Sequence, residues 1–462
     1  MNRYIFVGVT FLAATVASAF CHQAQAQTVC RVQQRNAEGI QSAIDECTKK
    51  GGGTVVVPTG LTVSGPIWMK DNVELHLERG AVVRMSRSVA DWRQDAPALV
   101  NSDGAHNIAF TGHGTFDGAA TWSYESVKRP DIEIAEEQAN AQRLGVEMKR
   151  YYRSGEVARY LFLLRNSQDI RFEGVTVKNA PFWNIRLQDC DGVRMHGIGV
   201  FSDLERGVNS DGIDIVSTSN VTISDSTVIT ADDAICLKSE AFSGATKPAG
   251  PVHNVLVTNS ILGSSSTPMM IGTETHADIR HVVFSNIVVR NSNKVFGINV
   301  QDGGTVSDVR FSNVTFETNR RHWNWWGSAE VMKFVLRRRT PSSALGRIEH
   351  ITVDGVQGTA RGTSVVRGDV ESPLRDISIA NLHVRMLPEN SVDKRASSGF
   401  VFENVEKLSL RQVEVEWATE NPEPKWDSAF VFRHIRGLQT TELKGKSARK
   451  GAPAIVKQDV RP

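Results

Sequence analysis

Three aspartates in the middle of the chain are spaced in a way that suits acid–base chemistry. Asp211 lies in the stretch NSDGIDIVS, and Asp232 and Asp233 lie in the later stretch ADDAICLKS. When the second stretch is slid back by 22 residues, Asp233 falls on Asp211 and the apolar residues that follow also coincide. Strands stacked in this register lie about 4.8 Å apart. The three carboxylates would then share one patch of surface.

Carboxylates held this close raise one another's pKa, because each negative charge disfavours ionisation of the next. One group can then stay protonated and donate a proton, while another is ionised and activates water. Two carboxyl groups hydrolyse a glycosidic bond in this way. The alternative is that these aspartates only cap backbone turns, as Asp often does. Two motifs in matching register favour the catalytic interpretation.

The elements that must position the aspartates recur along most of the chain. Each is a short run of alternating apolar residues, then Asn, Asp or Gly, then another short run. Alternation with period two indicates strands, and one unit buries its apolar face only by stacking on the next. We therefore predict an all-β fold, a right-handed parallel β-helix. Copies of the pattern begin at His106, Gln168, Asp191, Ser219, His253, Arg280, Ser307, Glu349, Arg375 and Glu406.

Two segments depart from the repeat. Residues 37–50 have helical spacing of apolar residues and end before three glycines, which predicts a short helical cap. The charged, helix-prone insertion at 119–160 is too long for a turn, so we expect it to shape a binding cleft. The expected organisation is a signal peptide (1–26), the N-terminal cap with the first strands (27–65), the catalytic β-helix (66–445) and a C-terminal tail (446–462).

The N-terminus is typical of an export signal. Arg3 precedes an apolar run, and Ala24-Gln25-Ala26 matches a cleavage site, so we expect a secreted or periplasmic protein cleaved after Ala26. The alternative, a membrane anchor, would need a longer and more apolar run.

Four cysteines remain after Ala26. An exported protein can keep disulfides, and we expect Cys30 and Cys47 to bridge the N-terminal cap. Cys190 and Cys236 are expected as small buried apolar residues.

The charge balance excludes some partners. The formal net charge is +2 and the pI is near 8.2, so nothing points to nucleic acid. No cysteine spacing suits a zinc site. We expect a monomer with no metal and no cofactor, which does not bind a membrane once the signal is cleaved. Its partner is expected to be a polysaccharide or oligosaccharide substrate.

Three motifs resemble those of glycoside hydrolase family 28, the polygalacturonase family: NSDGID (209–214), DDAICLKS (232–239) and GHGTFDG (112–118). The resemblance runs from about residue 30 to 410. It implies a secreted, metal-independent right-handed β-helix that hydrolyses pectin backbones with inversion. It also implies that Asp232 is the general acid, and that Asp211 and Asp233 hold and activate the water.

The chain departs from the family pattern at three positions. Thr267 replaces a histidine, and Asn299 and Gln301 replace the Arg-x-Lys pair that grips a substrate carboxylate. Because carboxylates are normally bound by Arg or Lys, we predict a neutral or masked sugar at that subsite. A rhamnogalacturonan-like or a substituted or exo-attacked galacturonan fits this prediction. Alternatively, Lys238, Arg280 or an arginine of the insertion replaces the missing cations.

Further candidates for substrate binding are polar or aromatic. The motif RHWNWWG holds tryptophans whose faces suit stacking on sugar rings, although the same residues could pack the loop onto the solenoid. Glu274 and Asp302, on the coils after the aspartates, either contact substrate or support the stacked coils. These candidates are Asn209, Lys238, Glu274, Asp302, His322, Trp323, Trp325 and Trp326.

Two other functions fit a carbohydrate-binding β-helix. In a uronate lyase or epimerase the aspartates would hold calcium. In a non-catalytic binding protein they would have no chemical role, and the intact acidic trio argues against that.

Overall fold

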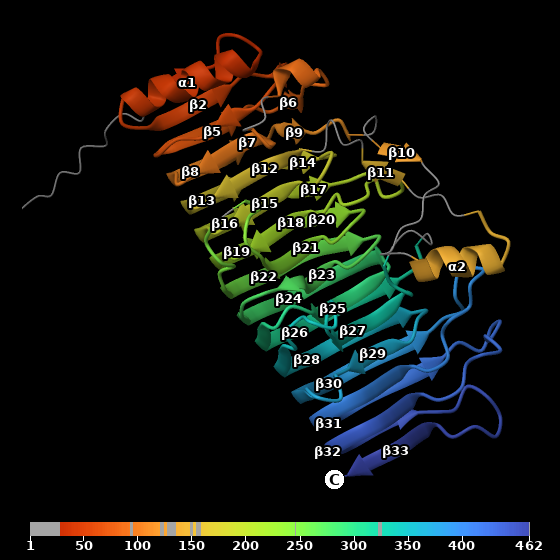
Figure 1. Ribbon diagram of the computed structural model, residues 1–462. Coiled ribbons are helices and arrows are strands. Elements are labelled where there is room, and N and C mark those ends of the chain that lie inside the picture. The colour runs from red at the N-terminus through yellow and green to blue at the C-terminus, as the bar shows by residue number, and fades with distance from the viewer. Residues whose placement is uncertain are drawn as a thin grey trace, which may run out of the picture.

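Short strands stack coil upon coil to form the molecule (Figure 1). The structure is a computed structural model that describes residues 28–92, 96–120, 124–126, 135–147, 151–153, 159–244, 246–321 and 326–461. Successive coils pair in parallel, so the predicted all-β, right-handed parallel β-helix is confirmed. The stack that carries the candidate site consists of β4 (Ile67–Trp68), β7 (Ala98–Asp103), β12 (Tyr160–Arg165), β15 (Ile185–Gln188), β18 (Ile213–Val216), β21 (Ile235–Ser239), β23 (Met269–Thr275), β25 (Lys294–Val300), β27 (Glu330–Leu336) and β29 (Ser364–Arg367).

Two further stacks complete each coil. One consists of β1 (Val29–Arg31), β2 (Gly53–Val57), β5 (Val73–Leu77), β8 (His106–Gly112), β13 (Gln168–Glu173), β16 (Asp191–His196) and β19 (Ser219–Ser224). The other consists of β3 (Gly60–Ser64), β6 (Ala81–Met85), β9 (Thr115–Asp117), β14 (Thr176–Lys178), β17 (Gly199–Phe201) and β20 (Thr227–Thr230).

In later coils the last two stacks merge into long strands. Near the C-terminus a single strand runs through all three stacks. These strands are β22 (Val252–Ser264), β24 (Ile279–Ser292), β26 (Thr305–Thr318), β28 (Arg347–Ala360), β30 (Leu374–Met386), β31 (Phe400–Trp417), β32 (Phe430–Gly445) and β33 (Ile455–Arg461). β33 lies within the stretch expected as a tail and pairs in parallel with β32.

The core runs along the solenoid because every second side chain of a strand points inward. Phenylalanines on successive coils stack there: the ring centres of Phe284 and Phe311 are 5.5 Å apart, and those of Phe311 and Phe334 are 6.1 Å apart. At the turns, asparagines with positive φ bond along the stack, as Asn254 does to Asn220 at 2.9 Å. Asn tolerates this left-handed conformation better than most residues.

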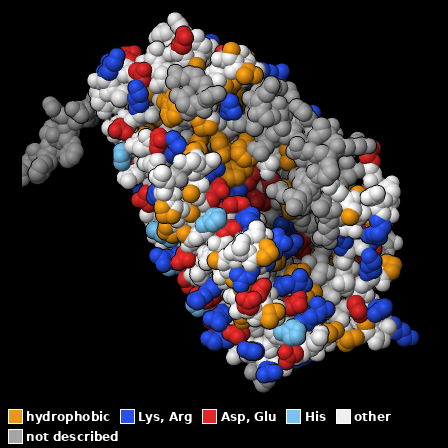
Figure 2. All heavy atoms as spheres, in the orientation of Figure 1, with side chains coloured by type: hydrophobic (Ala, Val, Ile, Leu, Met, Phe, Trp, Pro, Cys, Tyr) orange, Lys and Arg blue, Asp and Glu red, His pale blue; other side chains and the backbone are white. Residues whose placement is uncertain are grey.

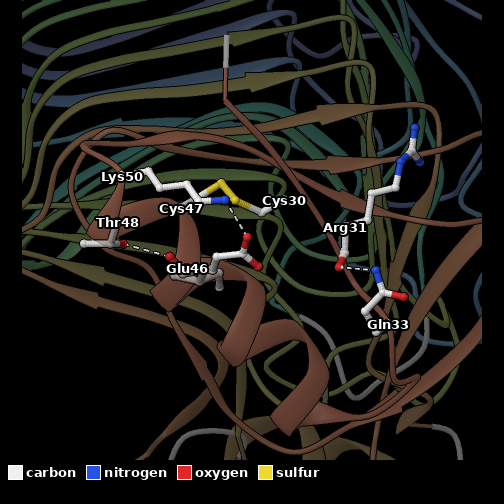
Figure 3. The surroundings of a disulfide bond; sticks show 8 residues. Cys30, Arg31, Gln33, Glu46, Cys47, Thr48 and Lys50 are labelled. Atoms are coloured by element: carbon white, nitrogen blue, oxygen red, sulfur yellow. Dashed lines mark hydrogen bonds and ion pairs between the residues drawn. A yellow bond between two sulfur atoms is a disulfide. The ribbon is translucent and has the colours of Figure 1, made fainter.

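The N-terminal end is closed by helix α1 (Ala37–Lys49), as predicted. The side chain of Asn36 caps it by accepting a hydrogen bond from the Gly39 N–H, and its buried face covers the first coil. The predicted Cys30–Cys47 disulfide joins this helix to β1 (Figure 3). Cys190 and Cys236 are free and buried, also as predicted.

The insertion contains helix α2 (Ala135–Arg143) and two antiparallel strands, β10 (Tyr124–Ser126) and β11 (Tyr151–Arg153). A short 3₁₀ turn spans Val89–Asp91. The predicted signal peptide lies outside the described residues. In the part of the chain that the structure describes, no helix is long and apolar enough to span a membrane.

Candidate active site

Strand pairing brings the three aspartates together as the repeat predicted. β18 pairs with β21 so that Ile213 faces Ile235, which places Asp211 beside Asp233. One carboxylate oxygen from each of Asp211, Asp232 and Asp233 lies within 4.8 Å of the others. No other group of three acidic, histidine or cysteine side chains gathers this closely in the described residues.

Asp232 and Asp233 lie on the turn that precedes β21, and hydrogen bonds from the same coil and the next coil hold them there. The carbonyl of Asp232 accepts hydrogen bonds from the hydroxyls of Thr230 (2.8 Å) and Ser264 (2.7 Å). The Asp233 carboxylate accepts one from the Thr267 N–H at 3.1 Å. Gly212 is needed where the coils approach, because an added Cβ would lie 2.3 Å from the Ala234 carbonyl oxygen. The carboxylates are therefore fixed by the stacked turns around them.

The surroundings give the aspartates different acidities. Burial raises the pKa of Asp232 well above its ordinary value, and the charges of Asp211 and Asp233 raise it further. Burial also raises the pKa of Asp211, to about 6, but the Lys238 ammonium opposes this effect. Burial and the neighbouring charges thus favour the protonated form of Asp232, while Lys238 favours the ionised form of Asp211. This is the arrangement that a general acid and a general base require.

Lys238 is buried among carboxylates, a role that sequence reasoning did not foresee. Its Nζ lies 2.9 Å from Asp214 Oδ1 and 3.4 Å from Asp211 Oδ2. The same atom lies 3.8 Å from the centre of a Trp183 ring, a cation–π contact. Burial raises the pKa of Asp214 while Lys238 opposes it. Lys238 therefore balances buried negative charge and is not free to grip a substrate carboxylate.

Trp183 and Arg186 form the N-terminal side of the cleft. Arg186 is buried, pairs with Glu240 at 2.9 Å and donates to the Tyr160 hydroxyl at 2.9 Å. Its guanidinium lies 4.9 Å from a Trp183 ring centre. These contacts hold the tryptophan beside the aspartates. Nothing in the repeat pattern marked either residue, because their contacts with Tyr160, Lys238 and Glu240 join different coils.

The aspartates open into a cleft of about 600 Å³, large enough for a small ligand. Figure 2 shows acidic side chains in a hollow on this face, with hydrophobic side chains towards the N-terminal coils and basic ones towards the C-terminal coils. The predicted residues that line the cleft are Asn209, Asp211, Asp232, Asp233, Lys238, Thr267, Glu274, Asn299, Gln301 and Trp326.

Other predicted residues lie elsewhere. Asp302 does not line the cleft: its carboxylate pairs with Arg339 at 2.7 Å and accepts a hydrogen bond from the Thr275 N–H at 3.1 Å. Arg280, proposed as a replacement cation, does not line it either. His322, Trp323 and Trp325 lie outside the described residues.

At two of the three positions that depart from the family pattern, buried polar atoms have no hydrogen-bond partner among the described residues. They are Thr267 Oγ1 and Asn299 Oδ1, and Asp211 Oδ1 shares this state. An unsatisfied buried polar atom costs about 1–3 kcal/mol. All three residues line the cleft, so hydroxyl groups of a bound ligand are suitable partners.

Four cations that line the C-terminal side of the cleft were not among the predicted site residues: Lys294, Lys333, Arg337 and Arg339. A signal was present in the sequence. In β27, Lys333 alternates with buried Met332 and Phe334, and the alternation continues to Arg337, so these cations occupy outward positions. From the sequence alone, the three arginines at 337–339 are interpreted as a solvated strand edge, with contact to an anionic polysaccharide as the lesser alternative.

Comparisons with known proteins agree with the fold and show the family. A "Probable polygalacturonase" of Vitis vinifera is 24% identical over 64% of this chain, but the match spans only 60% of that protein. An "Endo-polygalacturonase" of Pectobacterium parmentieri is 24% identical over 76% of this chain and 84% of its own length. The exopolygalacturonase structure from Thermotoga maritima has the same fold, with a TM-score of 0.67 at 20% identity over 84% of this chain and 92% of that one. The model of "Glycosyl hydrolases family 28" matches residues 47–392. The chain belongs to glycosyl hydrolase family 28.

Proposed function

We propose that this protein hydrolyses glycosidic bonds in a pectin-type polysaccharide by acid–base catalysis with inversion. The observation that carries the proposal is the buried Asp232, whose pKa is raised well above normal, beside Asp211 and Asp233. The names of the relatives support a pectic substrate.

In the proposed reaction Asp232 gives its proton to the glycosidic oxygen as the bond from that oxygen to the anomeric carbon breaks. A water held by Asp211 and Asp233 attacks the anomeric carbon from the opposite face and gives a proton to one of these carboxylates. The products are a sugar with inverted anomeric configuration and the protonated leaving group. Asp232 then takes up a proton from solvent, and the carboxylate that accepted the proton of the water releases it to solvent.

The short distance between the carboxylates by itself favours retention of the anomeric configuration. The nearest oxygens of the trio lie within 4.8 Å, whereas carboxyls of inverting enzymes are about 6.5–9.5 Å apart and those of retaining enzymes about 5–5.5 Å. We keep inversion because of family membership and because two carboxylates can share the water. NMR of the first product formed decides: a retained anomer would refute the inverting step and leave hydrolysis standing.

The substrate subsite formed by Thr267 and Asn299 suits a neutral or masked sugar. Their unpartnered buried oxygens can accept hydrogen bonds from sugar hydroxyls, whereas neither side chain carries the positive charge that normally binds a carboxylate. We therefore propose a rhamnogalacturonan-like substrate, or a substituted or exo-attacked galacturonan. Initial rates on rhamnogalacturonan oligosaccharides and on polygalacturonic acid test this. Faster hydrolysis of polygalacturonic acid would contradict the neutral subsite.

The same product analysis separates hydrolysis from the alternatives. A lyase would release an unsaturated uronide and lose activity when a chelator removes calcium, and a binding protein would release nothing. We expect saturated products and no effect of chelator.

We also propose that the protein acts outside the cytoplasm as a monomer that has lost residues 1–26. Mass spectrometry of the protein from its natural host and light scattering in solution test these points. A retained N-terminus would contradict cleavage after Ala26.

A further inference from the structure

Lys294, Lys333 and Arg337 line the cleft without a side-chain partner among the described residues. Lys294 is only 6% exposed, yet no described carboxylate lies within ion-pair distance of it. The neighbouring arginines differ, because Arg338 pairs with Glu371 and Arg339 with Asp302, each at 2.7 Å. The unpaired positive charge is thus concentrated on the side of the cleft that faces a ligand.

Strand register places these cations on coils beyond the aspartates. Ile235 pairs with Met269, and Met269 pairs with Phe296, so Lys294 at the start of β25 stands two coils after Asp233. Coils lie about 4.8 Å apart, so this separation is about 10 Å. Lys333 stands one coil further still, and Arg337 follows it on the same outward row.

Gly297 lies on the coil between the one that carries Lys333 and the one that carries Met270. Lys333 pairs in register with Gly297. An added Cβ at Gly297 would lie 2.6 Å from Met270 Sδ and 3.0 Å from Thr267 Cγ2, so these two side chains already pack over the glycine. Met270 and Thr267 line the same cleft as the cations, so a ligand group that contacts these two side chains is within reach of the positive charges.

Lys294 carries an electrostatic cost in the free protein. Burial lowers the pKa of its ammonium group, and the charge of Glu330 only opposes this effect from beyond ion-pair distance. A buried charge without a partner is unfavourable, and an anionic ligand would relieve that penalty. Arg337 adds the planar donor geometry that suits a carboxylate.

We infer that Lys294, Lys333 and Arg337 form a carboxylate-binding subsite for a uronate one or two sugar units away from the bond that Asp232 protonates. The inference rests on the proposed function and deepens it. A neutral sugar contacts Thr267 and Asn299, and the carboxylate of an acidic sugar further along the cleft contacts the cations. The substrate class is a polysaccharide in which neutral and acidic units alternate.

The test compares one acidic oligosaccharide with its carboxyl-reduced counterpart. The double variant Lys333→Met with Arg337→Met leaves the buried Lys294 in place. With the acidic substrate we expect kcat/KM to fall about ten- to hundredfold, as for the loss of one charged hydrogen bond. With the neutral substrate we expect less than a twofold change. Arg367→Met is the matched control, because Arg367 follows Val335 on the next coil but pairs with Glu403 outside the cleft. It should leave both rates unchanged.

Equal losses on both substrates, or no loss on either, would overturn the subsite. If the wild-type protein cleaves neither substrate, the proposed hydrolysis fails, and calorimetric binding then tests the subsite separately. Tighter binding of the acidic oligosaccharide that the double variant abolishes would support it. Equal binding of both oligosaccharides, or binding of neither, would refute it.

Discussion

Replacing Asp211 by Asn should make the protein more stable at neutral pH while removing activity. Asp211 is 3% exposed, and one of its oxygens has no hydrogen-bond partner. Burial raises its pKa from 3.8 to about 6. Asn has nearly the shape of the protonated acid but cannot ionise. Lys238 keeps its closer partner, Asp214, in this variant.

The magnitude follows from the pKa. Because the pKa of folded Asp211 lies above the unfolded value, the folded state is favoured when the group is neutral. That contribution is full below pH 3.8 and is lost as the pH rises through about 6. A shift of about two units corresponds to about 3 kcal/mol. Asp211→Asn should therefore raise the free energy of unfolding by about 3 kcal/mol above pH 7, and by less than about 1 kcal/mol near pH 4.

Urea unfolding of both proteins at pH 4 and pH 7.5 measures this difference. Glu420→Gln is the control, because Glu420 is exposed and lies outside the cleft; its stability difference should be small at both pH values. If Asp211→Asn changes stability equally at the two pH values, or destabilises the protein at pH 7.5, the buried carboxylate does not carry the cost deduced here.

Three further predictions concern the same structure. Asp232→Asn should lower turnover by at least about 10²–10⁴-fold with unchanged circular dichroism, since an amide cannot supply the proton; near-normal rates would refute its role as the acid. Lys238→Met should lower the free energy of unfolding at neutral pH by about 3–5 kcal/mol, because buried Asp214 loses its partner. The pKa of Asp211 should then rise further, so the acidic limb of the pH–rate profile should move to higher pH, and an unmoved limb would contradict this electrostatic role. Replacing both Cys30 and Cys47 by Ser removes a closure over 17 residues and should destabilise the N-terminal cap by about 3 kcal/mol; limited proteolysis should then cut within residues 28–52 first, and unchanged resistance there would be the contrary result.

Local patterns were sufficient to predict the fold and the acidic trio. Alternating apolar residues specify strands wherever they occur, and the common offset of 22 residues places Asp233 beside Asp211. The capping helix and its disulfide also followed from nearby residues. In each case the information lies within one coil or between two adjacent coils.

The composition of the cleft was decided only by the tertiary structure. After β21 the coils lengthen irregularly: Ile235, Met269, Phe296 and Met332 are in register although 34, 27 and 36 residues separate them. No fixed offset could therefore place Lys294 and Lys333 near Asp233. The pairing of Lys238 with Asp214, and of Arg339 with Asp302, depends on which outward side chains the stacked coils bring within reach. Which charges are neutralised and which remain free for a substrate is a property of those contacts, because electrostatic energy depends on distance and burial in space and not on separation along the chain.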